Sequence, residues 1–334
     1  MNVECAYIAN GVRRKIAAVG LALGVGLLPA KDALAQQYPV KPIRIVVGFA
    51  AGGPTDIGAR TIGQKLTESW GQPVIVDIRP GASGNIAAEL VAKSPPDAYT
   101  LLLAVFAHAV NPSLHSKLPF DAVKSFAPII RYASIANLLV VHPSIPARTV
   151  KELIAIATAR PGELTSGSAG TGTSSHLSIE LMAAMAGTRV THVPYKGLSA
   201  AHIDVVAGQL SMLFDNVVTA LPHAKAGRLR MLGVTTLTRW AGAPDVPTMS
   251  EAGLPGYEVN SWYGLLAPAG TPRELVLRLN SEVGRTLRAP DARERLFSIG
   301  AEPLSQTPEE FTAFIIAEVA KWAKVVRAAG IKIE

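Results

Sequence analysis

Short hydrophobic runs alternate along the chain with longer segments in which apolar residues recur at helical spacing. The first run, residues 42–47, is dense in β-branched residues and leads directly into the glycine-rich stretch 48–53. Pro54 and Asp56 then mark a helix start, because proline and acidic residues are favoured in the first turn. The helical pattern ends at Gly71. This order predicts a strand, a glycine-rich loop and a helix.

The same order recurs down the chain. Further strands are predicted at 73–77, 99–104, 137–143, 190–195, 208–215, 229–235 and 259–268. Further helices are predicted at 86–93, 149–157, 177–186, 272–287 and 308–329. Strands that alternate with helices are typical of an α/β fold with a parallel sheet.

The stretch Thr165–His176 is rich in glycine and hydroxyl side chains and immediately precedes the predicted helix 177–186. The first amide groups of a helix have no intrahelical acceptor, and the N-terminus carries about half a positive charge. Glycines let a ligand approach those amides. We therefore predict an anion-binding loop that needs no lysine or arginine. An ordinary capped loop is the alternative.

The N-terminal segment predicts export. Basic residues 13–15 precede an apolar run, residues 16–28, which is too short to span a bilayer. A small-x-small site follows, so we predict a signal peptide over residues 1–35, cleavage after Ala35 and a periplasmic protein. Cys5 is the only cysteine and lies in this segment. Disulfides and cysteine-bound metals are therefore excluded from the mature chain.

Composition narrows the class of protein. A length of 334 residues favours two domains, and 49% hydrophobic with 17% charged residues indicates a globular chain. The formal charge is +7, but the basic residues are scattered, so no nucleic-acid partner is expected. Beyond the N-terminus no apolar run is long enough to cross a membrane, and we expect no direct membrane insertion.

The sequence lacks the common catalytic motifs. There is no G-x-S-x-G, no H-E-x-x-H and no P-loop, and the seven histidines occur singly, without metal-ligand spacing. We therefore expect no catalytic residue, no metal and no cofactor.

Four motifs, in a fixed order, resemble those of a known family. They are Tyr38–Asp56, Arg79–Asn85, Pro96–Leu102 and Thr191–Gly197. Together they resemble the Bug family, the extracytoplasmic substrate-binding proteins of tripartite tricarboxylate transporters, over almost the whole mature chain. Three positions depart from the family pattern: Ile78, where Asn is usual, Ser83, where Gly is common, and Ala98, where Gly is usual.

The resemblance implies the type II periplasmic-binding-protein fold. This is an α/β architecture of two lobes, each a sheet flanked by helices, with the ligand cleft between them. Lobe 1 would be discontinuous, comprising residues 36–137 and 259–334, and lobe 2 would comprise residues 138–258. The two linking segments would form a hinge, and the C-terminal helices would pack on lobe 1.

The resemblance also implies a function. The protein would capture a small carboxylate and deliver it to the membrane permease of a tripartite tricarboxylate-type transporter. A monomer is expected, because the protein must dock the permease. Tricarboxylates, dicarboxylates, acidic amino acids, aromatic acids and neutral nicotinoid-like compounds are the ligand classes implied. Two alternatives stay open: a ligand sensor that feeds a signalling receptor, and a secreted α/β enzyme acting on carboxylates through a pair such as His176 with Asp215.

The implied ligand contacts fall on two sets of loops. In lobe 1, backbone amides and ordered waters would hold one carboxylate with few or no salt bridges, at Phe49, Ala50, Gly52, Gly53, Ser83 and Asn85. In lobe 2, the far end of the ligand would meet Ser168, Gly170, Thr171, Gly172, Thr173 and His176.

Four further candidates follow from their positions at loop ends: Asp56, His108, Tyr195 and Asp215. Each also has a structural interpretation. Asp56 is a favourable first-turn charge, His108 is a lone histidine, Tyr195 is an aromatic at a strand end, and Asp215 can accept from neighbouring amides. His176 likewise either donates to a bound carboxylate or supports its loop.

Overall fold

The computed structural model of the chain describes residues 38–195 and 197–331. The predicted signal peptide, its cleavage site and Cys5 lie outside the described residues, as do Lys196 and residues 332–334. The strands are β1 (Ile43–Val47), β2 (Val74–Ile78), β3 (Thr100–Val105), β4 (Phe126–Val141), β5 (Thr165–Ser168), β6 (Thr191–Pro194), β7 (Met212–Asn216), β8 (Arg230–Val234), β9 (Asn260–Pro268) and β10 (Ala301–Pro303). The helices are α3 (Pro54–Trp70), α4 (Asn85–Ala92), α5 (Phe106–Leu114), α6 (Val150–Ala159), α7 (Ser174–Ala186), α8 (Leu198–Val206), α9 (Val217–Lys225), α10 (Arg273–Thr286), α11 (Pro290–Phe297) and α12 (Pro308–Ala328), with a 3-10 turn η1 (Ala82–Gly84).

The strands of the described residues join in the order β2-β1-β3-β9-β4-β7-β5-β6, and β8 and β10 also pair with β4. The outer strands are parallel, since β1 pairs this way with β2 and β3, and β5 with β6 and β7. The central strands β4 and β9 are antiparallel to their neighbours. The prediction of a parallel sheet is therefore wrong at the centre, where β4 and β9 run in opposite directions beside each other.

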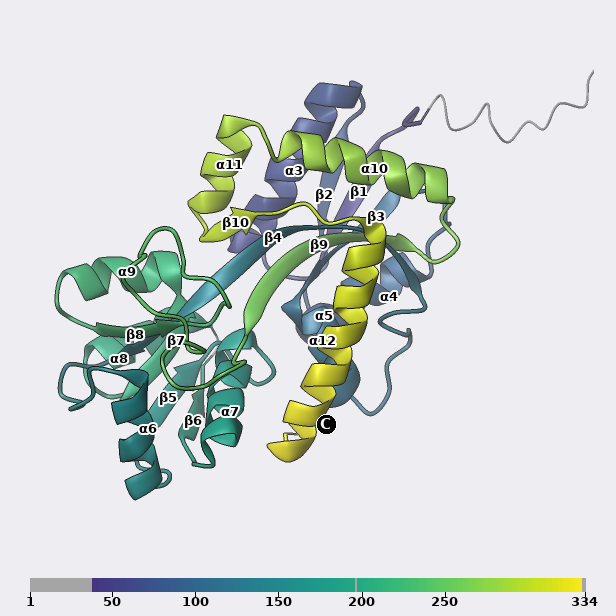
Figure 1. Cartoon of the computed structure of the whole chain (residues 1–334). Helices are drawn as coiled ribbons and strands as arrows, with labels where there is room; N and C mark the ends of the chain where they lie inside the picture. Colours follow the sequence, from purple (N-terminus) through teal and green to yellow (C-terminus); the bar gives the residue numbers. More distant parts are fainter. Residues whose placement is uncertain (1–37, 196, 332–334) are drawn as a thin grey trace, which may run out of the picture. The chain divides into compact units, whose positions relative to one another are not determined.

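Strand β4 takes part in both groups of strands (Figure 1). Residues up to Ala136 pair with β9, whereas Asn137 and the residues after it pair with β7 and β8. The sequence predicted only the last part of β4. Its earlier half pairs irregularly, with register shifts after Pro128 and Arg131, which obscure the alternating pattern. The predicted lobe limits lie close to the change of partners, and we propose it as the division between the lobes.

Residues on opposite faces of β4 enter different parts of the core. Leu139 and Val141 pack in a cluster that also contains Phe214 and Trp322, whereas Leu138 and Val140 pack in a second cluster. Successive side chains of a strand point to opposite faces, so this end of β4 is covered on both sides. That explains why the sequence there is continuously apolar.

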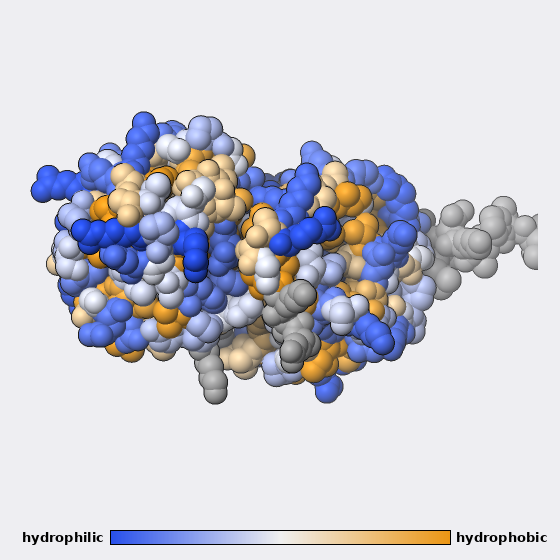
Figure 2. All heavy atoms as spheres, turned by 90° about the horizontal axis from the view of Figure 1, so that it is seen from below, coloured by the Kyte–Doolittle hydropathy of each residue, from blue (hydrophilic) through white to orange (hydrophobic). Residues whose placement is uncertain are grey.

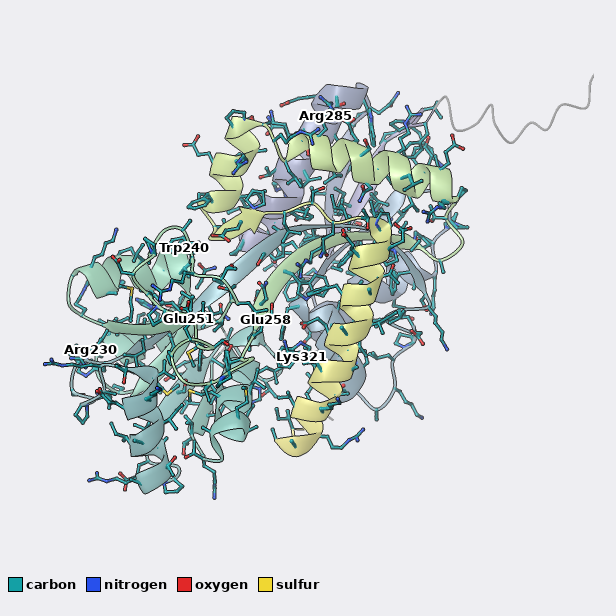
Figure 3. The ribbon with its side chains drawn as sticks, in the orientation of Figure 1. Arg230, Trp240, Glu251, Glu258, Arg285 and Lys321 are labelled. Atoms are coloured by element: carbon teal, nitrogen blue, oxygen red, sulfur yellow. The ribbon has the colours of Figure 1, made fainter. Side chains whose placement is uncertain are left out.

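The C-terminal helix α12 begins where the sequence predicted. Thr307 and Glu310 form a capping box at its start. Trp322 of α12 packs edge-on against Phe106 of α5, with ring centroids 5.0 Å apart. Lys321 donates a 2.7 Å hydrogen bond to the carbonyl of Glu258, the residue that leads back toward β9 (Figure 3). Helix α12 therefore fastens the returning chain as well as covering the sheet.

The sequence pattern did not predict several of the helices and strands. Helices α5 and α9 contain Pro112 and Pro222, which argue against a helix when read locally. Strand β5 was assigned to a loop, because Thr-Ser-Gly-Ser has little apolar character. Its parallel pairing with β6 and β7 makes it a strand. A side chain at Gly167 would come within 2.8 Å of Ala201, so close packing requires the glycine.

The surface shows no large apolar face in the view of Figure 2, where hydrophobic and hydrophilic residues are interspersed. Within residues 38–195 and 197–331, every helix is too short or too polar to traverse a bilayer.

The tight contact between β9 and α12 gives a stability prediction. A side-chain carbon at Gly264 would lie 2.3 Å from the Phe311 ring. Gly264→Ala should therefore lower the free energy of unfolding by about 1–3 kcal/mol through overpacking. Urea denaturation measures this change. A variant as stable as the wild type would show that α12 does not pack closely on β9.

Candidate functional site

The predicted site residues lie at the carboxyl ends of parallel strands. In one group, the loops and helix starts that follow β1, β2 and β3 carry Phe49 to Asp56, Ser83 with Asn85, and His108. In the other group, Ser168 ends β5 and is followed by the loop to His176, Tyr195 follows β6, and Asp215 lies near the end of β7. Ligands of open α/β sheets bind at such strand ends. The candidates thus form two clusters, one on each group of strands.

The loop after β1 is held by its own helix. Asp56 is buried, accepts the Gly52 N–H at 2.9 Å and pairs with Arg60 at 2.8 Å. Burial opposes ionisation, but the Gly52 amide and the Arg60 guanidinium outweigh it and lower the pKa of Asp56. This arrangement favours the structural interpretation of Asp56. Its charge is balanced by Arg60 and would repel a ligand carboxylate little.

The same loop leaves donors unused. Among the described residues, the N–H groups of Ala50 and Gly53 have no hydrogen-bond acceptor. Gly53 is the N-cap of α3, a 17-residue helix whose amino end carries partial positive charge. The loop therefore offers oriented donors to an anion without a cationic side chain.

The loop after β2 adopts an unusual backbone. Four successive residues have positive φ: Gly81 (134°), Ala82 (46°), Ser83 (54°) and Gly84 (90°). For a residue with a side chain this region costs about 1–3 kcal/mol and persists only where the surroundings enforce it.

The loops after β1 and β2 interlock. A side-chain carbon at Gly48 would lie 2.6 Å from Gly84 Cα, so glycine is required for this approach. Phe49, Asn85, His108 and Asn111 line a cavity of about 20 Å³ beneath them, roughly the space of one water.

His108 is buried and serves the core. Its Nε2 lies 2.8 Å from the Ala122 carbonyl, and its ring packs on Phe120 and Phe126. Burial lowers the pKa of His108 to about 4, so the ring is neutral and Nε2–H donates. The structural interpretation of His108 is favoured, although its ring reaches the small cavity.

The loop from Ser168 to His176 satisfies many of its own amides. The N–H of Gly170 donates to Ser168 Oγ, that of Ala169 to Ser175 Oγ, and that of Gly172 to His176 Nδ1, all at 3.0–3.1 Å. Thr173 is the N-cap of α7 but its hydroxyl donates to the Gly170 carbonyl instead of capping the helix.

Other amides of this loop stay available. Among the described residues, the N–H groups of Thr171, Ser174 and Ser175 have no acceptor. They precede a 13-residue helix, so the helix dipole adds to their attraction for an anion. The hydroxyl groups therefore shape the loop, while these amides and the dipole can bind a ligand.

Two stacked histidines support the loop from behind. The rings of His176 and His192 lie 3.8 Å apart, and His192 Nε2 is 2.6 Å from Ser168 Oγ. Because His176 Nδ1 accepts from Gly172, its proton is on Nε2, 3.3 Å from Glu180. Burial, together with the nearby His176, lowers the pKa of His192 to about 4. The loop-supporting interpretation of His176 is favoured.

Sequence reasoning missed two supporting residues, His192 and Asn111. His192 reaches the loop only because β6 pairs with β5. Asn111 donates to the Ser83 carbonyl and to Asn85. In the sequence Asn111 is only an asparagine before a proline, and its segment was not predicted to be a helix.

Tyr195 and Asp215 are engaged with neighbours. The Tyr195 hydroxyl donates to Asp204 at 2.6 Å, and this bond raises the pKa of Tyr195 to about 12. Asp215 is fully buried and lies 2.6 Å from His202 Nδ1. The pairing of His176 with Asp215 needed by the enzyme hypothesis is not formed, because each is bonded to another residue.

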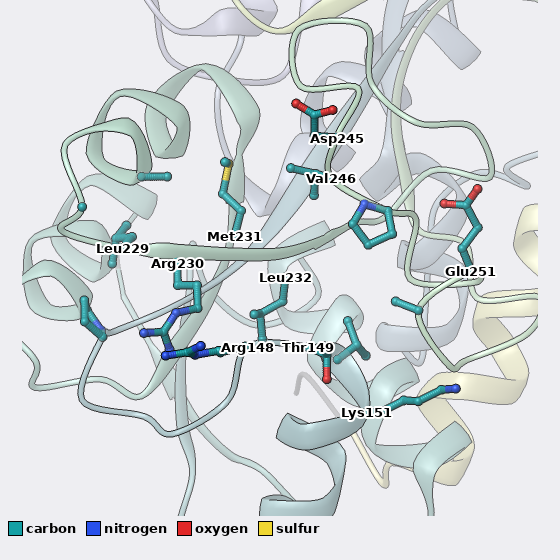
Figure 4. Close-up of a pocket in the computed structure, with 16 residues that line it drawn as sticks. Arg148, Thr149, Lys151, Leu229, Arg230, Met231, Leu232, Asp245, Val246 and Glu251 are labelled. Carbon is teal, nitrogen blue, oxygen red and sulfur yellow. The ribbon is translucent and has the colours of Figure 1, made fainter.

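A separate surface pocket of about 880 Å³ lies against β8 (Figure 4). Arg148, Lys151, Arg230, Asp245 and Glu251 contribute to its wall, together with apolar residues of β8. It contains none of the predicted site residues. Among the described residues, no group of three His, Cys, Asp or Glu side chains is placed to hold a metal ion.

Comparison with known proteins gives consistent matches. The profile of a family described as "Tripartite tricarboxylate transporter family receptor" matches residues 58–331. A protein from the tcbD-tcbE intergenic region of Pseudomonas sp. (strain P51) is 39% identical, with 97% of this chain and 96% of that protein aligned. BugT of Bordetella pertussis is 33% identical, with 96% and 99% aligned.

Solved structures agree. Rpa4515 of R. palustris, determined with adipate, is 40% identical, with a TM-score of 0.76 over 89% of this chain and all of that one. MatC of Rhodopseudomonas palustris, with bound malate, is 33% identical, with a TM-score of 0.72 over 86% and 100%. These matches confirm the resemblance noted in the sequence and the two-lobed periplasmic-binding-protein fold.

The buried His108 gives a pH prediction. Its folded pKa, about 4, is below the ordinary value of 6.5, so the unfolded chain binds the proton first as pH falls. Stability should therefore be lost between pH 6.5 and about 4, by about 2 kcal/mol at pH ~5 relative to pH ~7. His108→Gln keeps a donor for Ala122 but does not titrate, and its acid loss should be smaller by that amount. Urea denaturation at both pH values measures it, and equal losses in the two proteins would contradict the assignment.

Proposed function

The chain belongs to the tripartite tricarboxylate transporter receptor family, and on that premise we propose that it is a periplasmic solute-binding protein for a small carboxylate. The observation that carries the proposal is the 40% identity, over nearly nine tenths of the chain, to a protein whose structure was determined with adipate. A dicarboxylate is the ligand class that we favour.

The geometry of the two clusters supports a carboxylate. Each cluster has a helix amino end with unused amides, Gly53 in one and Ser174 in the other. A dicarboxylate has an anionic group for each. Amides and helix dipoles bind anions without buried salt bridges, which avoids the cost of desolvating a cation. We assign the ligand to the cleft between the lobes, with the residues of both clusters as its contacts.

Closure of the lobes would make binding selective. A ligand that contacts both clusters stabilises the closed state by its difference in affinity for the two states. We further propose that the closed monomer delivers its ligand to a membrane permease, and that the chain is exported to the periplasm after cleavage at Ala35.

We infer a binding protein without catalytic activity. General acid–base catalysis on a bound carboxylate would need a pair of titratable side chains beside the ligand. His176 and Asp215 do not provide one, since His176 holds Gly172 and Asp215 is bonded to buried His202.

The proposal is tested by thermal unfolding of the mature chain with adipate, malate, citrate, aspartate, benzoate and nicotinamide. A ligand present at about one hundred times its Kd should add about 2.7 kcal/mol to the free energy of unfolding and raise Tm by several degrees. Recovery of the ligand unchanged is expected. A ligand that is consumed would replace the transport function by an enzymatic one. No shift with any carboxylate, in protein shown by mass spectrometry to be ligand-free, would refute the proposal.

A pair of threonine variants tests the lobe 2 loop. Thr173→Val removes the hydroxyl that donates to the Gly170 carbonyl at 2.6 Å, and should weaken adipate binding about tenfold. Thr191→Val removes an equal bond, to the Gly162 carbonyl at 2.6 Å, away from the predicted contacts. It should leave the affinity unchanged in titration calorimetry. Equal affinities in both variants would remove the Thr173 loop from the site.

A further inference from the structure

Asn111 holds the loop after β2 from below. It lies in α5, is 2% exposed, and its Nδ2 donates to the Ser83 carbonyl at 3.1 Å and to Asn85 Oδ1 at 2.7 Å. Both acceptors belong to the loop. Asn85 is also the first residue of α4, so one amide group fixes the turn and the helix start together.

The turn that Asn111 bonds is the strained part of the lobe 1 cluster, the candidate residues that follow β1, β2 and β3. Ala82 and Ser83 both have positive φ although they carry side chains. Such a backbone relaxes unless tertiary contacts hold it. Within the described residues, the backbone bond from Gly84 N–H to the Gly81 carbonyl closes the turn on itself. The bond from Asn111 to Ser83 ties this turn to α5.

The strained turn also contacts the loop after β1, so the conformation of one affects the position of the other. Gly84 packs directly against Gly48 and faces the Phe49 ring, so a relaxed turn would displace the start of the loop after β1. The same residues, with Asn111, enclose the small cavity at the carboxyl ends of β1 and β3. Asn111 is therefore placed to control the position of both lobe 1 loops without any requirement to touch the ligand.

We propose that Asn111 is a positioning residue of the binding site: it holds the turn Ala82–Gly84 in the strained conformation in which the lobe 1 loops bind a carboxylate. The proposal rests on the proposed function for its effect on affinity, whereas its effect on the turn can be measured without a ligand.

The test compares Asn111→Ala with the wild type in two measurements. Titration calorimetry with adipate should show affinity lowered about tenfold or more, because the turn relaxes. Hydrogen exchange of the ligand-free proteins should be faster at Gly84, whose N–H closes the turn onto Gly81. If Asn111→Ala does not fold, Asn111→Ser serves in the same comparison.

Ala82→Gly provides a rescue that a merely structural role would not give. Glycine adopts positive φ freely, so it removes strain that Asn111 would otherwise have to hold. The double variant Ala82→Gly, Asn111→Ala should bind adipate at least about threefold more tightly than Asn111→Ala alone. A core-packing defect at Asn111 would not be repaired by a change in the turn.

Asn280→Ala is the matched control. Asn280 Nδ2 also donates to two acceptors, the carbonyls of Ile129 and Gln306, but it lies on α10, away from the predicted site residues. This variant should lose stability while its adipate affinity stays within about twofold of the wild type.

The outcomes separate the two proposals. If the wild type binds adipate and Asn111→Ala binds it with equal affinity, the proposed function stands and the positioning role is overturned. Loss of affinity without rescue by Ala82→Gly also overturns it. If the wild type binds no carboxylate, the proposed function fails, and faster exchange at Gly84 in Asn111→Ala still supports the hold on the turn. Unchanged hydrogen exchange at Gly84 in Asn111→Ala refutes the hold of Asn111 on the turn.

Discussion

The backbone hydrogen bonding of β4 is the constraint on which the rest of the structure depends. One 16-residue strand pairs with β9 along its first part and with β7 and β8 along its last part. A strand must satisfy its amide and carbonyl groups on both edges when it is buried. Because both groups of strands pair with the same segment, one continuous strand joins them. Asn137, at the change of partners, also bonds Ser174 at the start of α7.

Each cluster of candidate ligand contacts solves the same electrostatic problem. A carboxylate needs donors, but a buried lysine or arginine is costly to desolvate when the ligand is absent. The two loops instead combine glycine, helix amino ends and a limited number of unused amides. Most polar side chains in these loops, such as Asp56 and Thr173, bind their own loop rather than stand free. This satisfies the loop internally and leaves the remaining amides oriented before a ligand arrives, which lowers the entropy lost on binding.

The two clusters reach this order by different means. The lobe 1 turn is held against its own backbone strain, by Asn111 and by close approach of Gly48. The lobe 2 loop is held by hydrogen bonds to the stacked rings of His176 and His192. Packing around a strained turn tolerates little change in volume, whereas the lobe 2 loop depends on side-chain hydrogen bonds from one strand and one helix. The loops therefore differ in what can disturb them, even though both present helix amides.

The sequence by itself determined the strand–loop–helix units, the starts of α3, α6 and α12 and the glycine-rich loops, because these depend on residues a few positions apart. Family motifs extended this to the two-lobed fold and to a carboxylate as the ligand. Only the tertiary structure decided the antiparallel centre of the sheet, the strand character of β5, and which group satisfies each loop amide. The reason is distance along the chain: Asn111 meets Ser83 from 28 residues away and His192 meets Ser168 from 24. No local pattern records such partners, since strand pairing and helix packing bring them together.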